Sequence, residues 1–331
     1  MADRRVLITG VNGFIGSHLA NRFLDAGWEV RGLVRATSDQ SFLRGKSLEL
    51  VVGDVTHRAS LDAAMGGVEV VVHVAGLASD WGQWARFHAV NVQGTMHAAE
   101  SARIHGVRRF VQISSAAVHG FEGARDRTEA APMAPSRFSY VESKRLAEVW
   151  LFEFARRHRF EVVAIRPGNV YGPRDHTFIR KYADAIRAGK GGYVSGGRAR
   201  TCPTYVENLA GAVLLAADHP AASGEAFLIT DGLDIDWRTF TDKLVAAAGL
   251  PRPRWSVPFW IGYPLAAAVE VIYRLCRSRT PPLLTRYRIC NGGRDYHFDI
   301  SKARKALGFT PAVGLDEALQ RTAAWLKQES R

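Results

Sequence analysis

Thr9-Gly10-Val11-Asn12-Gly13-Phe14-Ile15-Gly16 indicates the fold of this chain more clearly than any other segment. A short apolar run precedes it, and apolar residues continue at helical spacing from its end until Gly27. This pattern predicts a glycine turn between a strand and a helix. Gly10 permits the tight turn, Gly13 lets the backbone approach a pyrophosphate, and Gly16 lets the helix pack closely on the sheet. Because the N–H groups at a helix start favour anions, the turn is predicted to hold the phosphates of a dinucleotide.

A second predicted strand, Glu29 to Arg35, ends about twenty residues beyond the turn, where the adenosine ribose of a dinucleotide lies. Sites that prefer NAD usually carry an Asp or Glu there, whereas this chain carries Val34 and Arg35. No carboxylate is then available to repel a ribose 2′-phosphate, and the Arg35 guanidinium can bind it through two hydrogen bonds. We therefore expect NADP(H) to be favoured, with NAD(H) as the alternative if Arg35 is only a solvated surface charge.

Strands alternate with helices through the first half of the chain, which is the pattern of a parallel sheet covered on both faces. We predict an α/β fold with a Rossmann-type doubly wound parallel sheet over residues 1–168. A smaller, irregular C-terminal substrate lobe is expected over 169–331, from which 203–231 returns to the sheet.

Two strand ends are expected to meet the cofactor, because ligands in such sheets bind outside the carboxyl ends of the strands. The strand over 48–53 ends at Asp54 and Val55, which are placed beside the adenine. The strand over 68–74 ends at Val74, Ala75 and Gly76, which are placed along the dinucleotide.

The composition is typical of a globular enzyme made and kept in the cytoplasm. The 331 residues are 47% hydrophobic, and Cys202, Cys276 and Cys290 have no spacing that indicates a disulfide framework or a zinc site. The segment before the first strand is charged and the apolar run after it is too short for a secretory signal. The eleven histidines show no metal-ligand spacing, so no metal is expected. The net charge of +12 comes from arginines spread along the chain, which argues against a nucleic-acid partner and leaves an anionic membrane surface open.

Three residues supply the chemistry of an oxidation or reduction. Ser115 follows a predicted strand, and Tyr140 and Lys144 lie four residues apart in a helix predicted over 136–158, so that they share one face. A phenol with a pKa of about 10 must be acidified by about three units, or roughly 4 kcal/mol, to act as a base at neutral pH. One positive charge about 4 Å away supplies roughly that free energy. We therefore expect Lys144 to lower the pKa of Tyr140; the other interpretation is a surface helix with a core-facing tyrosine and a solvated lysine.

Together these motifs resemble the extended branch of the short-chain dehydrogenase/reductase superfamily over essentially the whole chain. The matching segments are Thr9 to Gly16, Asp54-Val55, His73-Val74-Ala75-Gly76, Asn91-Val92-Gln93-Gly94-Thr95, Ser114-Ser115, Tyr140 to Lys144, Arg166-Pro167-Gly168-Asn169-Val170-Tyr171-Gly172-Pro173 and Tyr205-Val206-Glu207-Asn208. The resemblance implies that Tyr140 is the general acid/base, that Lys144 lowers its pKa and holds the nicotinamide ribose, and that Ser115 binds the reacting oxygen. The expected cofactor contacts are Gly10, Asn12, Gly13, Phe14, Ile15, Gly16, Arg35, Asp54, Val55, Val74, Ala75, Gly76, Tyr140, Lys144, Pro167, Asn169 and Val170.

Within that branch the later half is similar to 3β-hydroxysteroid dehydrogenases, sterol-4α-carboxylate 3-dehydrogenases and bacterial reductases of long-chain β-keto acids. The similar segments are Trp81-Gly82-Gln83-Trp84, Pro258 to Tyr273, Pro282-Leu283-Leu284-Thr285-Arg286 and Asp299 to Arg304. The implied reaction interconverts a secondary alcohol and a ketone, such as the 3β-hydroxyl and 3-keto group of a sterol. The alternatives are a nucleotide-sugar epimerase or dehydratase, and a nucleotide-sensing module without chemistry, which would be expected to lack the Ser, Tyr and Lys set.

The stretch 255–277 is apolar but too interrupted to span a membrane. A proline-rich loop leads into a predicted helix over 265–276, in which Glu270, Arg274 and Arg277 form one charged stripe and leave the other faces apolar. One interpretation is an ordinary core helix. The other is a hydrophobic rim of the substrate pocket that contacts the inner face of the membrane peripherally, with flanking arginines suited to anionic lipid.

The helices expected over 91–106 and 136–158 resemble those through which this branch forms dimers. Val149, Phe152 and Phe154 give the second helix more apolar surface than one sheet face should cover. The sequence therefore predicts a homodimer.

Overall fold

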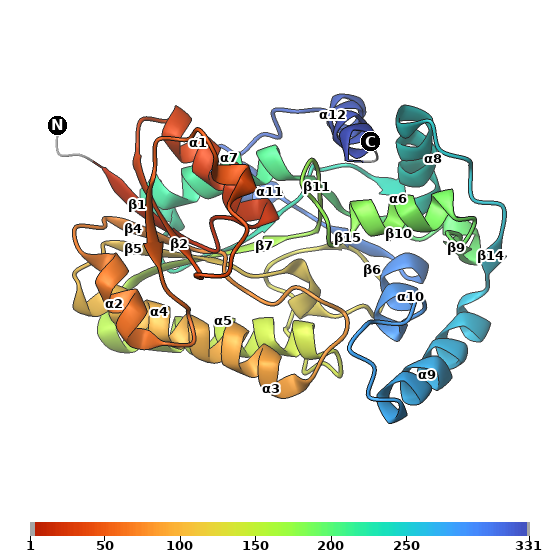
Figure 1. The fold of residues 1–331 in the computed structure, drawn as a ribbon, viewed down its shortest axis with the longest axis horizontal. Helices are drawn as coiled ribbons and strands as arrows, with labels where there is room; N and C mark the ends of the chain where they lie inside the picture. The colour runs from red at the N-terminus through yellow and green to blue at the C-terminus, as the bar shows by residue number, and fades with distance from the viewer. Residues whose placement is uncertain (1–3, 330–331) are drawn as a thin grey trace.

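The computed structural model describes residues 4–329 and contains a seven-stranded parallel sheet (Figure 1). The strand order across the sheet is β12-β7-β5-β4-β1-β2-β3, and every neighbouring pair is parallel. The strands are β1 (Arg5–Thr9), β2 (Glu29–Val34), β3 (Glu49–Val52), β4 (Val70–His73), β5 (Arg109–Ile113), β7 (Glu161–Pro167) and β12 (Ala226–Ile229). This confirms the predicted Rossmann-type sheet.

The strand order reverses direction between β1 and β4, which is where such sheets form their ligand crevice. Thr9 at the end of β1 pairs with Leu33 of β2 on one side and with His73 of β4 on the other. The carboxyl ends of these strands therefore lie at one edge, together with the glycine turn that follows Thr9.

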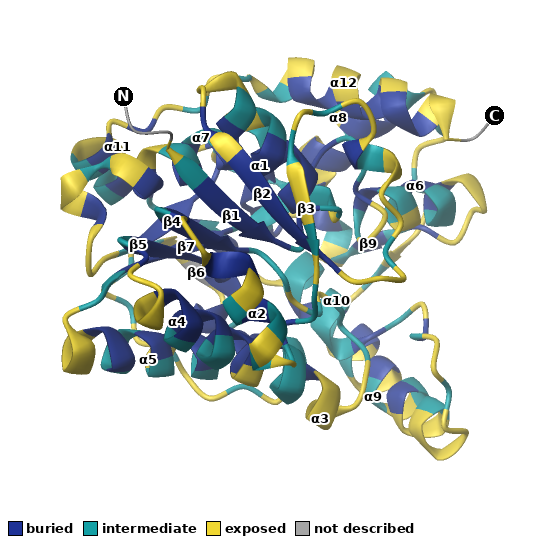
Figure 2. Ribbon diagram, turned by 60° about the vertical axis from the view of Figure 1, so that its left-hand side comes forward, coloured by how far each residue is buried: buried dark blue, intermediate teal, exposed yellow. Residues whose placement is uncertain are grey.

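Helices cover both faces of the sheet (Figures 1 and 2). One face carries α1 (Phe14–Asp25), α7 (Val206–Asp218) and α11 (Ser301–Leu307). The other carries α2 (Arg58–Met65), α4 (Gly94–Ile104) and α5 (Ser139–His158). Burial on both faces explains why the central strands are continuously apolar instead of alternating.

The second lobe stands over the carboxyl ends of the strands, and two apolar clusters pack it against the elements of the sheet layer. Its helices are α6 (Ile179–Arg187), α8 (Trp237–Ala248), α9 (Phe259–Leu275), α10 (Arg286–Gly293) and α12 (Leu315–Gln328). Short two-stranded pairs join its loops: β8 (Asn169–Tyr171) with β11 (Pro203–Tyr205), β9 (Tyr193–Val194) with β14 (Ser256–Val257), β10 (Arg200–Thr201) with β13 (Ile235–Asp236), and β6 (Ala124–Arg127) with β15 (Tyr296–Phe298). Between β11 and β13 the chain returns to the seven-stranded sheet, where β12 forms its edge strand and α7 covers one face.

Several element boundaries differ from the sequence-based expectation. The helix expected over 91–106 begins earlier, as α3 (Trp84–Phe87) and a π-helical turn (His88–Gln93) that run into α4. The helix expected from 265 begins at Phe259 and continues through Pro264. Pro264 removes one backbone donor from the helix, but the turns on both sides are retained.

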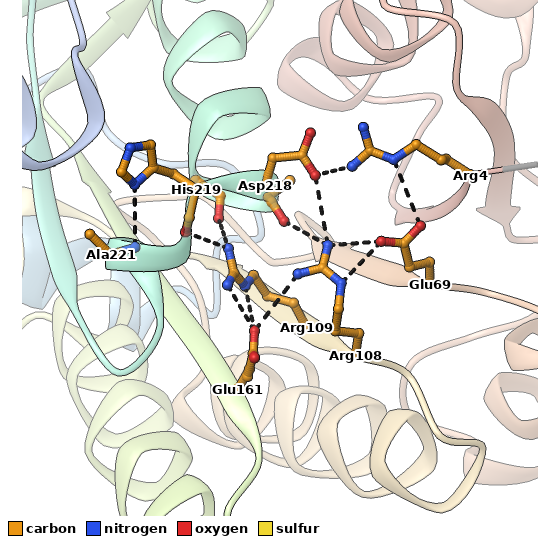
Figure 3. Close-up of polar contacts among 10 residues, drawn as sticks. Arg4, Glu69, Arg108, Arg109, Glu161, Asp218, His219 and Ala221 are labelled. Atoms are coloured by element: carbon orange, nitrogen blue, oxygen red, sulfur yellow. Dashed lines mark hydrogen bonds and ion pairs between the residues drawn. The ribbon is translucent and has the colours of Figure 1, made fainter. Parts of the chain in front are cut away.

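A network of ion pairs ties together the amino-terminal edge of the sheet, opposite the predicted site (Figure 3). Arg109 is buried and donates to the Glu161 carboxylate at 2.9 Å and to the backbone oxygens of Ala216 and His219 at 3.0 and 2.8 Å. The two carbonyls belong to the end of α7, so this arginine joins a strand to a helix C-terminus.

Candidate active site

The glycine turn has the shape that a pyrophosphate requires. Gly10 has a φ of +66°, and a Cβ there would lie 3.0 Å from the Cα of Ala75 on the loop after β4. A Cβ at Gly16 would lie 2.2 Å from the Gly10 carbonyl oxygen. Gly16 is therefore needed because the first turn of α1 lies against the backbone of Gly10 and Val11, not because the helix packs on the sheet. The open side of the turn, before α1 begins at Phe14, fits the phosphates of a dinucleotide.

The ends of β1 and β4 are fixed to each other by one hydroxyl. Thr9 Oγ1 accepts the N–H groups of Val74 and Ala75, each at 3.1 Å, and contacts Nδ1 of His73 at 2.9 Å. Burial lowers the pKa of His73 to about 3, so this imidazole is neutral. The backbone of Val74 and Ala75 is thereby held next to the glycine turn, as predicted for the wall of a dinucleotide site.

The adenosine end of the site contains a carboxylate that the sequence had not placed beside Arg35. Burial acts to raise the pKa of Asp54, but hydrogen bonds from Thr56 and the positive charge of Arg35 outweigh it, so the pKa falls below its usual value. Arg35 is exposed, and its backbone N–H donates to Ser38 Oγ at 3.2 Å. Asp54, which the sequence placed beside the adenine, therefore also lies near Arg35, and its carboxylate was not counted in the expectation drawn from positions 34 and 35.

Two further predicted residues border this end. Val55 is buried against α4, where a Cβ on Gly94 would lie 2.9 Å from its side chain. The Asn12 amide donates to the backbone oxygen of Asp39 at 3.1 Å, which ties the loop after β2 to the glycine turn.

Ser115, Tyr140 and Lys144 converge at the end of β5. Ser115 caps the short 3-10 helix Ala116–His119, and its Oγ accepts the Ala117 N–H at 3.2 Å. Tyr140 lies in the first turn of α5 with its hydroxyl hydrogen-bonded to Ser115. The Nζ of Lys144, one turn further on, donates to the backbone oxygen of Ile113 at 2.7 Å. The three residues predicted from sequence therefore share one site.

The electrostatics of this group differ from the prediction. Burial raises the pKa of Tyr140, and the hydrogen bond from Ser115 opposes this only in part. Burial also lowers the pKa of Lys144 to about 8, with the Glu148 carboxylate acting in the opposite direction. The pKa of Tyr140 therefore rises instead of falling as expected, because the desolvation of the phenol dominates.

The Lys144 ammonium lies beside the loop after β4. A Cβ on Gly76 would lie 3.4 Å from Nζ and 3.2 Å from Oδ1 of Asn91. Asn91 holds this loop by accepting the Leu77 N–H at 2.7 Å, and it donates to Ser143 Oγ of α5 at 2.8 Å. Gly76 is thus required for the close approach of the loop to the lysine.

The residues after β7 face the second lobe more than the crevice. Pro167 ends β7 opposite Ile229, and Val170 packs between the two lobes. The Asn169 amide donates to Thr201 Oγ1 at 3.1 Å and exchanges hydrogen bonds with Asn291. The side chain of Asn169 is therefore bonded to the substrate lobe, so any cofactor contact it makes comes from its backbone or after rearrangement.

Sequence reasoning missed an aromatic wall around Ser115. Tyr296 of β15 is 4% exposed, its ring lies 5.0 Å from that of Phe121, and its hydroxyl is hydrogen-bonded to Ser115. Tyr287 of α10 packs in the same apolar cluster as Tyr140, and its ring lies 5.1 Å from that of Phe121. The alternating apolar segment before Asp299 was the only sequence signal for Tyr296.

Behind Tyr140 and Lys144 lies a buried ion pair. The Glu148 carboxylate on α5 accepts from Arg166 Nε of β7 at 2.9 Å and from the Ser114 hydroxyl. Arg166 also contacts Nε2 of His119 at 3.1 Å. This pair joins the helix that carries Tyr140 to the strand ends that carry Ser115.

Comparison with known proteins gives consistent matches over the whole chain. A model of the NAD dependent epimerase/dehydratase family matches residues 6–230. Sterol-4-alpha-carboxylate 3-dehydrogenase, decarboxylating, of Mus musculus is 30% identical, with 96% of this chain and 90% of that protein covered. The 2-alkyl-3-oxoalkanoate reductase of Stenotrophomonas maltophilia (strain K279a) is 28% identical, with 97% and 98% covered.

Solved structures match equally broadly. The crystal structure of gox2253 is 27% identical with a TM-score of 0.83, and 99% of each chain is covered. A UDP-glucose 4-epimerase of Thermus thermophilus, solved in complex with NAD, is 23% identical with a TM-score of 0.76, and 98% of this chain and 99% of that chain are covered. The second match supports the fold alone.

Proposed function

Since the chain belongs to the NAD-dependent epimerase/dehydratase family, we propose that it interconverts a secondary alcohol and a ketone on a large hydrophobic substrate. The reacting group is the 3β-hydroxyl or 3-keto group of a sterol or steroid, or the ketone of a long-chain β-keto acid. The observation that carries the proposal is the convergence of Ser115, Tyr140 and Lys144 among aromatic side chains at the edge where the glycine turn lies. A nicotinamide cofactor bound along that turn supplies or accepts the hydride.

The protein's own residues handle the proton and the oxygen. In the reducing direction Tyr140 donates its phenolic proton to the forming alkoxide, and Ser115 donates a hydrogen bond to the same oxygen. The raised pKa of Tyr140 keeps the phenol protonated, as an acid must be. The Lys144 ammonium, beside Gly76, provides positive charge at the position expected for the nicotinamide ribose.

The names of the relatives support a hydrophobic substrate. One acts on a sterol carboxylate and the other on an alkyl-substituted oxoalkanoate. Both names place the reacting carbon in a large apolar molecule, whereas a nucleotide sugar is polar. The aromatic cluster around Tyr140, which includes Phe259, Tyr263 and Tyr287, suits the apolar class.

The test is a turnover assay with NADPH and NADH against sterols, long-chain β-keto acids and nucleotide sugars. We expect Tyr140→Phe to lower kcat by about a thousandfold and to leave cofactor affinity within about twofold, because the phenol acts on the reacting oxygen. Conversion of nucleotide sugars alone would establish the epimerase alternative. Full turnover by Tyr140→Phe on every accepted substrate would refute the catalytic assignment.

We also propose NADP(H) as the preferred cofactor, with Arg35 binding the 2′-phosphate. Arg35 is exposed and its side chain is free to turn toward a ribose. The family description names NAD, and the nearby Asp54 carboxylate weakens the attraction for a phosphate. The preference is therefore expected to be modest.

A second proposal concerns α9, whose exposed apolar residues we call the α9 surface. They are Trp260, Ile261, Leu265, Val271, Ile272 and Leu275. Trp260 is 75% exposed and Leu275 is 78% exposed, and Figure 2 shows α9 at the periphery of the molecule. The core-helix interpretation is therefore wrong.

The predicted charged stripe of α9 divides in the structure, because Glu270 is buried whereas Arg274 is exposed. The buried stripe is Gly262, Ala266 and Glu270, and the Glu270 carboxylate accepts from Arg286 Nε at 2.9 Å. The charged residue thus faces the protein, and the apolar residues face outward. None of the helices in residues 4–329 is long and apolar enough to cross a bilayer.

We propose that the α9 surface lies on an anionic membrane, with exposed arginines at 252, 254, 277 and 279 beside it. Trp260→Ser/Leu275→Ser should lose co-sedimentation with anionic vesicles, and Leu215→Ser, at an exposed apolar position on α7, should keep it. Equal sedimentation of the double variant and the parent would contradict the proposal.

A homodimer through α4 and α5 remains a proposal with a weaker basis than the sequence indicated. Val149 is 42% exposed, but Phe154 is 8% exposed and its ring stacks on Trp150 at 4.8 Å. Phe154 was therefore wrongly counted as surface. Exposed Ile104 at the end of α4 adds an apolar position that the sequence argument had not used.

A further inference from the structure

Two arginines beside the proposed site have no acidic partner among residues 4–329. They are Arg137, three residues before Tyr140, and Arg294, two residues before Tyr296. Both are exposed, and neither forms an ion pair with a carboxylate in the part of the chain that the structure describes. The position of both arginines follows from contacts with aromatic rings and backbone.

These contacts bring the two guanidinium groups to one aromatic pair. Phe259 and Tyr263 of α9 stack with ring centroids 5.6 Å apart. The Arg294 guanidinium carbon lies 4.8 Å from the centroid of the Phe259 ring, and Arg137 donates to the Tyr263 hydroxyl at 3.2 Å. Each ring of the stacked pair therefore contacts one guanidinium group, Phe259 that of Arg294 and Tyr263 that of Arg137.

The same aromatic pair borders the proposed reaction centre. Phe259 and Tyr263 belong to the apolar cluster that contains Tyr140, Tyr287 and Tyr296. Arg294 also donates to the backbone oxygen of Phe121, the residue whose ring contacts Tyr287 and Tyr296. A molecule whose reacting carbon is at Tyr140 can thus place a neighbouring anionic group toward the arginines.

The nearby acids are already bonded elsewhere. Glu142 binds Arg145 at 2.6 Å, and it also accepts the Ser136 N–H. Asp295 binds Arg125 at 2.8 Å and accepts the Arg200 N–H. The two arginines of α10 differ from Arg137 and Arg294, because Arg286 is paired with Glu270 and Arg288 with Asp80. Arg137 and Arg294 therefore keep unneutralised positive charge beside the aromatic pair Phe259 and Tyr263.

We propose that Arg137 and Arg294 form a subsite for a carboxylate of the substrate. This inference rests on the proposed function and narrows it, since the substrate then is an acid whose carboxylate lies close to the reacting carbon, as in a β-keto or β-hydroxy acid. Guanidinium groups bind carboxylates through charge-assisted hydrogen bonds. A neutral sterol or ketone gains nothing from these two charges.

The experiment compares 3-oxododecanoate with its methyl ester, which keeps the ketone and the chain and removes the charge. In the parent we expect kcat/KM for the acid to exceed that for the ester by about a hundredfold, at about tenfold for each exposed charge-assisted contact. Arg137→Met/Arg294→Met should lose that advantage and should reduce the ester within about twofold of the parent. Arg137→Lys/Arg294→Lys should recover part of the preference, and Arg22→Met, at an exposed position on α1, is the matched control.

Each failure has its own signature. Equal kcat/KM of the parent for the ester and the acid would refute the subsite. So would an equal loss of kcat/KM for both compounds in Arg137→Met/Arg294→Met, because the two arginines would then only support the packing of Phe259 and Tyr263. If the parent reduced neither compound but converted nucleotide sugars, the proposed function would fall and the subsite with it.

Discussion

Lys144→Met should change how the stability of this protein depends on pH. Burial lowers the pKa of Lys144 from 10.5 to about 8 in the folded protein. Each unit of such a shift corresponds to about 1.36 kcal/mol, so the buried charge costs roughly 3.4 kcal/mol of stability at pH 7. A methionine of similar length carries no charge, and the variant avoids this cost.

The sign follows from proton binding. Between pH 8 and 10.5 the unfolded chain holds a proton on this lysine that the folded protein has released, so the stability of the parent rises with pH in that window. Integration gives a gain of about 2 kcal/mol for the parent relative to the variant between pH 7 and pH 9.5. Loss of the hydrogen bond to the Ile113 oxygen lowers the unfolding free energy of the variant by a similar amount at both pH values, because the neutral amine of the parent also donates this bond.

The assay is urea unfolding of the cofactor-free protein followed by far-ultraviolet circular dichroism at the two pH values. Lys181→Met, at an exposed position on α6, removes the same charge at the surface, and any pH dependence common to both variants is subtracted. Unfolding free energies of parent and Lys144→Met that differed equally at pH 7 and pH 9.5 would show that burial does not shift this lysine.

Four further predictions concern the buried ion pair, the cofactor end, the aromatic wall and the assembly. Glu148→Met should lower the unfolding free energy by about 3–5 kcal/mol because it leaves Arg166 buried without a partner, and Glu148→Met/Arg166→Met should recover most of the loss in urea unfolding. Arg35→Ser should bring the dissociation constants of NADPH and NADH together in fluorescence titrations, whereas equal constants in the parent would mean that Arg35 is only a surface charge. Tyr296→Phe should lower kcat about tenfold with unchanged cofactor affinity, because Ser115 loses a hydrogen bond that orients it; an unchanged kcat would reduce Tyr296 to packing. Light scattering should report a dimer for the parent and a monomer for Val149→Glu, and a monomeric parent at micromolar concentration would contradict the proposed assembly.

The fold and the centre of the site could be read from the sequence because their signals are local. The glycine turn lies between one strand and one helix that are adjacent in the chain, and the alternation of strands and helices predicts a parallel sheet. Tyr140 and Lys144 are one helical turn apart, so the period of the helix places them on one face. Within the glycine turn and within the Tyr140 and Lys144 pair, the residues that carry these inferences are separated by a few positions only.

The direction in which α9 faces depends on contacts with another helix. Its sequence is apolar on most sides, so the helical period does not distinguish the buried stripe from the exposed one. The orientation is fixed by Glu270, whose partner Arg286 lies on α10. The sequence around such a carboxylate does not predict its burial, because the burial depends on an ion pair with a residue of another helix.

The aromatic wall and the electrostatics of the site also arise from long-range packing. Tyr296 reaches Ser115 from a strand far along the chain, and Asp54 comes near Arg35 because their strands are neighbours in the sheet. The pKa of Tyr140 rises because surrounding residues remove water from its hydroxyl, and the hydrogen bond from Ser115 opposes this only in part. The order of residues establishes which chemical groups are present and how near they lie along the chain, whereas burial and distant contacts, which set their charge and partners, depend on how the whole chain packs.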